Sequence, residues 1–275
     1  MPRAKPRLFI IILGFLGLTW VAARTLPPGI DWHETYYPAA RAVLAGRSPY
    51  EVAGFRIAPW AIVPFLPLGL LPEDWGRAAY FVLSLFAYAW LAWRLGARGW
   101  TLALALLAPP VWHGLLNANI DWLPMLGFVL PPRWGLFFLV IKPQVGIGLT
   151  LYWFIQAVRQ GGWRRVLHDF GPVSLALGLS VLLFGPWPLR FQAPLTFWWN
   201  ASLWPASLPI GLALLTHSVR TQEPRWAMVA GPFFAPYILF HSWVAAVYPL
   251  APWPAEFTAV VLGLWGMVLW RGLSG

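Results

Sequence analysis

Apolar stretches long enough to cross a lipid bilayer follow one another along most of the chain, and short segments bearing arginine separate them. A crossing helix needs about 20 residues. Charged residues make up only 10% of the 275 positions, against roughly 25% in an ordinary soluble domain. Because so few polar groups cannot cover a globule in water, the sequence predicts an all-α polytopic membrane protein that forms one integral membrane domain.

The first apolar stretch, residues 8–23, predicts an uncleaved membrane span. It has the basic start and apolar core of a signal sequence, but no small-residue cleavage motif follows it. Arg3, Lys5 and Arg7 precede it, and the positive-inside rule then predicts a cytoplasmic N-terminus. The loop 24–57 is accordingly expected on the extracytoplasmic face.

A short surface helix is expected within that loop. Apolar residues recur at helical spacing over residues 34–45, while Arg41 falls on another face and Gly46 ends the run. Such a pattern is typical of a helix lying along the membrane interface.

Later stretches differ in how well they suit a regular crossing. Residues 58–72 contain four prolines, and residues 120–132 are too short for an unaided crossing. Each of these two stretches either crosses the membrane irregularly or re-enters from one side, so eight to eleven membrane segments are expected. Irregular backbone at membrane depth must be covered by protein or by a water-filled cavity. A cavity is therefore predicted near residues 58–72 and 117–144. Better-formed spans are predicted at residues 76–95, 100–116, 134–157, 170–186, 201–217, 226–247 and 255–270.

Ionisable groups are concentrated between Asp31 and Pro59. This segment holds three of the nine carboxylates, three arginines and His33. In a chain with so few charged residues, such a concentration marks the place where chemistry is most expected. No disulfide or thiolate metal site can form, because the chain has no cysteine. The net charge of +10 is explained by basic residues that set the membrane orientation and contact lipid phosphates, and no nucleic-acid partner is expected.

Several sequence elements resemble a known family. Residues 31–50 read DWHETYYPAARAVLAGRSPY, Ala58-Pro59 and Pro67-Leu68 follow, and Lys142-Pro143-Gln144 lies in a later apolar run. Together they resemble the GT-C superfamily of membrane glycosyltransferases, and most closely its polyprenyl-phosphate-mannose-dependent mannosyltransferases, glycosyltransferase family 87. The resemblance covers residues 1–170, a GT-C-like core, whereas residues 171–275 match only in being membrane helices.

The resemblance implies transfer of a sugar, mannose in the closest branch, from a polyprenyl-phosphate carrier to a lipid or glycan acceptor at the extracytoplasmic face. An acceptor hydroxyl needs a carboxylate base, and Asp31 stands where the family has this residue. Glu34, one helical turn away, is the second catalytic candidate. For Asp31, a helix N-cap or a partner of a loop arginine is the structural alternative. No cofactor and no metal are expected.

The departing lipid phosphate needs cationic or amide donors. Lys142 lies in an apolar run, where a cation is costly and normally faces a cavity with a partner. That partner is either the carrier phosphate or a structural partner such as Asp121 or Asn117, or else the lysine snorkels to an interface. The remaining candidates for substrate binding are His33, Tyr36, Tyr37, Arg41, Arg47, Arg56, Asn117, Asn119, Asp121 and Gln144.

Two other classes remain open at the level of sequence. A non-catalytic membrane subunit of a larger assembly, derived from the same fold, would suit a chain shorter than is usual for the family. A lipid or solute transporter would also use broken helices and an intramembrane lysine. In every case membrane lipids are expected as partners, and other membrane subunits are an open possibility.

Overall fold

The computed structural model describes residues 4–190 and 199–274, and every regular element within these ranges is helical. Two helices in this part of the chain are long and apolar enough to cross a membrane, Pro143–Phe184 and Pro254–Leu273. Ile12–Thr25 is a shorter apolar helix. The all-helical class predicted from the sequence is confirmed. Arg3, which was used to predict the orientation, lies outside the described residues.

The chain forms two compact units. The first comprises Met1–Phe55, Pro59–Ala87 and Leu115–Asn119, and the second comprises Arg56–Ala58, Tyr88–Gly114 and Ile120–Gly275. The chain therefore enters and leaves each unit more than once. Asn119 and Asp121, two residues apart in sequence, belong to different units.

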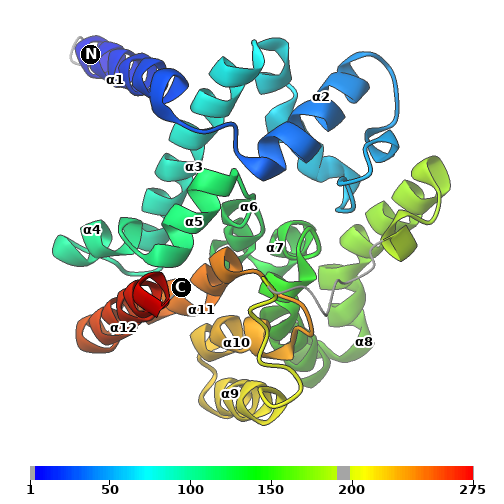
Figure 1. Ribbon diagram of the computed structural model, residues 1–275. Coiled ribbons are helices and arrows are strands. Elements are labelled where there is room, and N and C mark those ends of the chain that lie inside the picture. The colour runs from blue at the N-terminus through cyan, green and yellow to red at the C-terminus, as the bar shows by residue number, and fades with distance from the viewer. Residues whose placement is uncertain (1–3, 191–198, 275) are drawn as a thin grey trace. The chain divides into compact units, whose positions relative to one another are not determined.

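The first unit is built on three α-helices and a set of tighter turns (Figure 1). A π-helical turn at Trp32–Tyr36 leads directly into α2, so the helix predicted over residues 34–45 is present and ends at Leu44. Gly46 follows with φ of +73°, the left-handed conformation that ends a helix. The helices are α1 (Ala4–Thr25), α2 (Tyr37–Leu44) and α3 (Glu73–Arg94), whose residues from Tyr88 onward belong to the second unit.

The proline-rich stretch 58–72 forms no α-helix. It contains two 3₁₀ segments, Pro59–Phe65 and Leu68–Leu70. Proline removes a backbone donor and clashes with the preceding turn, so the four prolines hold this stretch in short pieces. The irregular backbone predicted here is confirmed.

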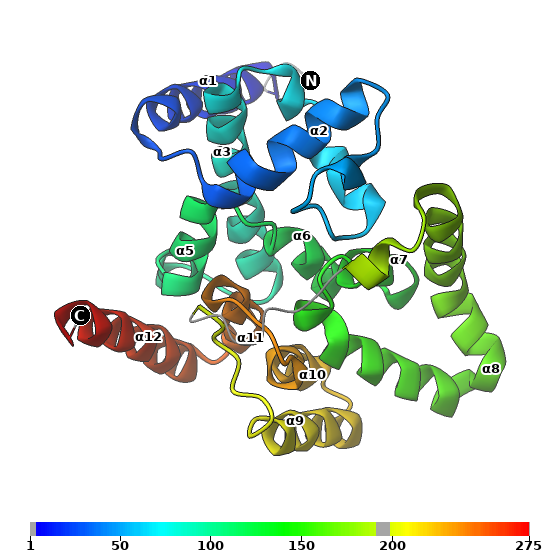
Figure 2. The same cartoon turned by 45° about the vertical axis from the view of Figure 1, so that its right-hand side comes forward.

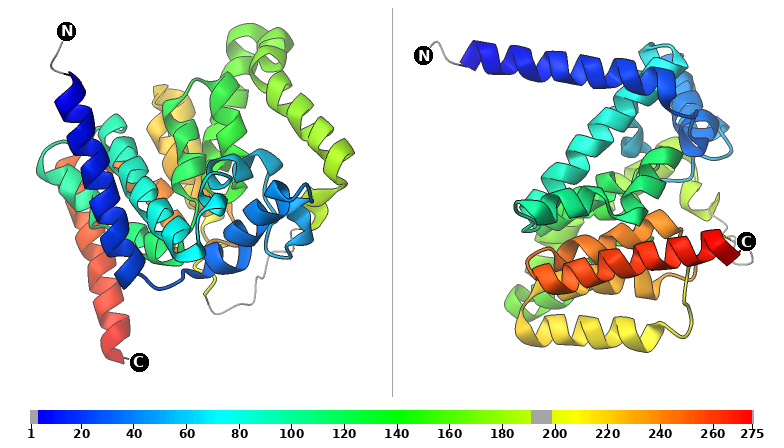
Figure 3. Two further views of the ribbon diagram at one scale, coloured as in Figure 1. Left: turned by 90° about the horizontal axis from the view of Figure 1, so that it is seen from above. Right: turned by 60° about the vertical axis from the view of Figure 1, so that its left-hand side comes forward.

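The second unit contains the remaining helices. Within it α9 packs against α10, and α7 packs against α8 (Figure 1). The helix α12 is a single straight rod that contacts α4 (Figure 3). Its helices are α4 (Trp100–Leu106), α5 (Pro109–Asn117, whose last residues join the first unit), α6 (Trp122–Met125), α7 (Pro132–Leu139), α8 (Pro143–Phe184), α9 (Leu208–Thr221), α10 (Pro224–Ala230), α11 (Val244–Val247) and α12 (Pro254–Ser274).

Four predicted spans are not continuous helices, and one of them, 201–217, is helical only from Leu208. The other three are interrupted. The span 100–116 is split before Pro109, the span 134–157 is split before Pro143, and the span 226–247 breaks after Ala230 into 3₁₀ turns and the short α11. In the first two cases the proline occupies one of the first positions of the new helix. A backbone N–H at such a position has no partner within the helix, so its absence in proline does not destabilise the helix. Hydrophobicity alone therefore overestimated helix length.

The helix α8 is bent at one residue. Gly162 has φ of +57° and ψ of −152°, which no α-helix contains, so residues 143–161 and 163–184 form two arms. The change of direction is visible in Figure 2. The predicted span 170–186 is the outer part of the second arm.

Candidate functional site

Asp31 begins the helical segment of the first unit, and its carboxylate is held by an amide. Asn119 Nδ2 donates to Asp31 Oδ2 at 2.6 Å. The Asp31 backbone is itself helical, with φ of −68° and ψ of −31°, and its side chain makes no capping hydrogen bond. Asp31 is half-buried, whereas Asn119 is buried. The carboxylate is therefore oriented by a neutral donor and does not cap a helix.

Trp32, the residue after Asp31, packs in an aromatic core and holds the Asp31 backbone in place. The Trp32 side chain has no exposed surface, and its indole N–H donates to the Glu73 carbonyl at 3.2 Å. Its ring stacks on Tyr80, with ring centroids 5.8 Å apart, and lies 6.4 Å from Phe65. Because this indole is locked by packing and by its hydrogen bond, the backbone at Asp31 has little freedom.

Two side chains of α3 hold the segment that carries Asn119. Arg77 Nη2 donates to the Leu115 and Leu116 carbonyls at 2.7 Å and 2.9 Å, and the Tyr80 hydroxyl donates to the Asn119 carbonyl at 3.0 Å. Arg77 is only 2% exposed. We call Arg77, Tyr80 and residues 115–119 the α3 clamp. Ala118 within it has φ of +60°, an unusual conformation for alanine that surrounding contacts must maintain.

The sequence signal for the α3 clamp was weak, and Arg77 and Tyr80 were not among the predicted site residues. A single arginine in the first turns of a predicted span is ordinarily read as an interfacial residue. An ionisable group placed just inside an apolar helix, as Arg77 is, was the one available hint.

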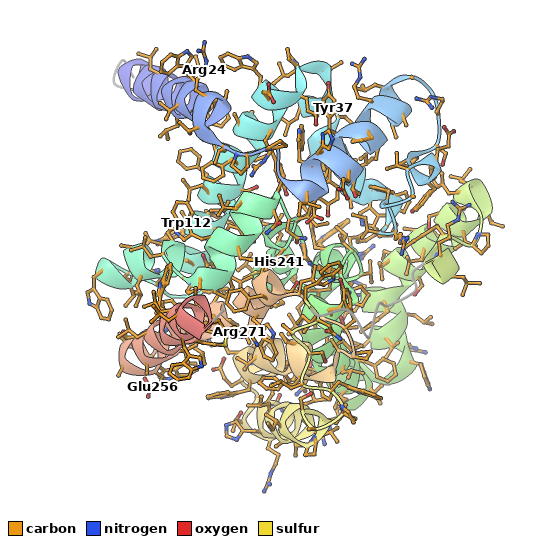
Figure 4. All side chains as sticks on the ribbon, viewed as in Figure 1. Arg24, Tyr37, Trp112, His241, Glu256 and Arg271 are labelled. Carbon is orange, nitrogen blue, oxygen red and sulfur yellow. The ribbon has the colours of Figure 1, made fainter. Side chains whose placement is uncertain are left out.

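The other predicted residues of the outer loop take different roles. His33 Nδ1 lies 2.6 Å from Glu73 Oε1, and this bond together with the charge of Glu73 raises the pKa of His33 above 6.5. Glu34 is exposed. Tyr36 is buried and stacks on Phe65 at 4.6 Å between ring centroids. The Tyr37 hydroxyl, on α2 in Figure 4, donates to the Leu71 carbonyl at 3.3 Å.

The three loop arginines are exposed. Arg41 donates to the Gly69 carbonyl at 3.3 Å, and Arg47 forms an ion pair with Glu51 at 3.0 Å. Exposed pairs of this kind contribute about 0 to 1 kcal/mol, so the Arg47 pair can exchange partners at little cost. Arg56 belongs to the second unit.

Lys142 lies at the start of α8 in the second unit, and it is paired. Its Nζ is 2.6 Å from Asp121 Oδ1, and the two side chains are 13% and 0% exposed. This is the structural partner that the sequence left open beside lipid phosphate. Gln144 in the first turn of α8 and Asn117 at the end of α5 are both half-buried.

The pair forms part of a larger cluster, which we call the Asp121 cluster, in which Asp121, His241 and Ser242 are buried and His113 is exposed. The Ser242 hydroxyl donates to both oxygens of Asp121, at 3.2 Å and 3.1 Å. His241 Nε2 lies 3.6 Å from Asp121 Oδ2 and 3.5 Å from Lys142 Nζ. His113 Nδ1 lies 3.2 Å from His241 Nδ1, with the two rings stacked. Figure 4 shows His241 on the segment leading into α11.

The predicted site residues thus fall into two groups. The first unit brings Asp31 and Asn119 together, and the second brings Asp121 and Lys142 together. His113, His241 and Ser242 were not predicted, because the cluster joins distant segments. Ser242 is 121 residues from Asp121, and His113 contacts His241 from 128 residues away. Within residues 4–190 and 199–274, no group of three or more His, Asp or Glu side chains is arranged to hold a metal ion.

Comparisons with protein-family models, curated proteins and solved structures found no match to this chain. Its function must therefore be argued from its own residues.

Proposed function

We propose that this protein is a membrane glycosyltransferase that transfers a sugar from a polyprenyl-phosphate carrier to a hydroxyl acceptor, with Asp31 as the general base. The observation that carries the proposal is the setting of Asp31. Its carboxylate is half-buried, oriented by Asn119, and placed in the loop element that resembles the family 87 enzymes.

The hydrogen bond from Asn119 suits a base. It orients one carboxylate oxygen, and an ionised carboxylate has about four acceptor sites in all. A neutral amide does this without adding a positive charge that would compete for the acceptor proton. Asp31 can then accept the proton of a hydroxyl as that oxygen attacks the anomeric carbon.

Negative charge develops on the departing lipid phosphate. Arg41 and Arg47 are exposed arginines of the outer loop, and they can bind this phosphate. Neither is held in a buried ion pair that phosphate binding would have to break. Lys142 we assign to structure, because withdrawing it from Asp121 would leave a fully buried carboxylate without its cation.

A multi-pass topology, with the N-terminus in the cytoplasm and loop 24–57 on the outer face, belongs to the same proposal. It is supported by the two long apolar helices, by the apolar α1, and by the basic residues that precede the apolar run at residues 8–23.

The test is sugar transfer by the purified full-length chain in nanodiscs, with radiolabelled polyprenyl-phosphate sugars as donors and membrane lipids as acceptors. Removing a positioned base typically costs about 100- to 10,000-fold in rate. Asp31→Asn should therefore nearly abolish transfer and change donor affinity only a few-fold. Asp74→Asn is the matched control, an exposed carboxylate in the first turn of α3.

Two results would contradict the proposal in different ways. Transfer by Asp31→Asn at the parental rate would remove Asp31 from the role of base. Absence of transfer by the parental protein with every donor would favour the non-catalytic membrane subunit.

A further inference from the structure

A second polar site lies in the second unit, between α7 and the two arms of α8. A cavity of about 170 Å³ is lined by Tyr152, Trp153, Gln156, Gln160, Arg165 and Asp169, all of them on α8. None of these residues belongs to the proposed transfer site.

The bend at Gly162 creates this cavity. Gln156 and Gln160 lie on the first arm of α8, whereas Arg165 and Asp169 lie on the second. A straight helix would separate Gln156 from Asp169 by about 20 Å along its axis. The left-handed conformation of Gly162 instead lets both arms line one space, and a side chain there would be strained.

One donor in the cavity wall has no partner among the described residues. Gln156 is 8% exposed, and its Nε2 makes no hydrogen bond. Gln160 Nε2 donates to Gln156 Oε1 at 3.3 Å, which fixes the amide, and the Tyr152 hydroxyl lies beside it without accepting a well-directed bond from Nε2. A buried donor left without an acceptor costs about 1 to 3 kcal/mol, so the Gln156 amide would gain a partner by turning toward a ligand oxygen in the cavity.

The charged groups of the cavity neutralise each other. Asp169 Oδ2 accepts from Arg165 Nε at 2.7 Å, and Asp169 Oδ1 lies 2.8 Å from His168 Nδ1. His168 Nε2 in turn lies 3.1 Å from Arg133 Nη1. An anionic ligand would face the Asp169 carboxylate, and a cationic ligand would face the Arg165 guanidinium.

We propose that this cavity binds a neutral polyol of monosaccharide size. Each sugar hydroxyl is both donor and acceptor, which matches a wall that offers carboxamide, carboxylate, guanidinium and phenol groups together. Trp153 and Tyr152 also line the cavity, and their rings supply apolar surface for the sugar C–H groups. The volume suits a single ring.

The inference is independent of the proposed transfer reaction, because its test measures binding alone. The full-length protein in a detergent without a sugar headgroup would be titrated with methyl α-D-mannopyranoside, methyl β-D-glucopyranoside, myo-inositol and inorganic phosphate. Saturation-transfer NMR reports binding and its dissociation constant. At least one polyol should bind, and phosphate should neither bind comparably nor displace it.

Variants distinguish the cavity from the rest of α8. Gln156→Met, close to isosteric, and the milder Tyr152→Phe should each weaken polyol binding, the first by about ten-fold, which corresponds to about 1.4 kcal/mol. Trp163→Leu and Arg164→Gln are matched controls on the same helix outside the cavity, and they should bind as the parental protein does. Thermal unfolding checks that each variant folds.

Three results would overturn the inference. They are the absence of binding by all three polyols, phosphate binding at least as tight as the best polyol, and equal losses in Trp163→Leu and Gln156→Met.

Discussion

Asp31 in the first unit and Asp121 in the second are two carboxylates with opposite surroundings. Asp121 is fully buried and is satisfied by Lys142 and Ser242, whereas Asp31 is half-buried and receives a neutral amide donor from Asn119. A buried carboxylate paired with a cation has a structural role, because removing its partner leaves an uncompensated charge in the protein interior. A half-buried carboxylate that is hydrogen-bonded by a neutral amide can still accept a proton from a substrate hydroxyl. The contrast separates a structural carboxylate from a candidate catalytic one.

The largest expected effect comes from breaking the Asp121 pair. Lys142→Met should lower the free energy of unfolding by about 3 to 5 kcal/mol, since it leaves a buried, uncompensated carboxylate. The double change Asp121→Leu with Lys142→Met should recover much of that loss. Unfolding in mixed micelles, followed by tryptophan fluorescence, measures both. A loss under about 1 kcal/mol for Lys142→Met would remove Lys142 from a structural role and return it to the phosphate candidates.

A smaller effect is expected from the α3 clamp that supports Asp31. Tyr80→Phe removes the donor to the buried Asn119 carbonyl and should cost about 1 to 3 kcal/mol of unfolding free energy. Tyr37→Phe is the matched control, because its hydroxyl bond to Leu71 is exposed, and it should cost within about 0.5 kcal/mol. Equal losses in the two variants would show that the clamp does not hold Asn119 in place.

The smallest effect concerns His33, near Asp31 in sequence. Glu73 raises the pKa of His33 above 6.5, so the link between them is fully formed below that pH and is lost as pH rises through the higher folded-state value. In an NMR titration of the histidine ring protons, Glu73→Gln should move the His33 midpoint back toward 6.5. His33→Gln assigns the signal. An unchanged midpoint in Glu73→Gln would exclude Glu73 as the cause.

The sequence placed several elements well because they depend on local rules. The helix over residues 34–45 followed from an apolar period ending at Gly46, and the broken stretch 58–72 followed from its prolines. Spans such as 134–157 failed because a hydrophobic average does not register where one helix ends and a proline begins the next. The spans 134–157 and 170–186 implied a connection between them, whereas the structure continues the helix through those residues and changes direction at Gly162 alone.

The sequence by itself determined that the chain is helical and apolar, and that Asp31 and Lys142 stand in unusual positions. Only the tertiary structure decided their partners. Asp31 meets Asn119 from 88 residues away, and Lys142 takes Asp121 as its partner, as one of the sequence alternatives allowed. Ser242 and His241 come from a distant segment to complete the Asp121 cluster. The physical reason is that hydrophobic period and proline act on neighbouring residues, whereas the partner of a charge is chosen by how distant segments pack.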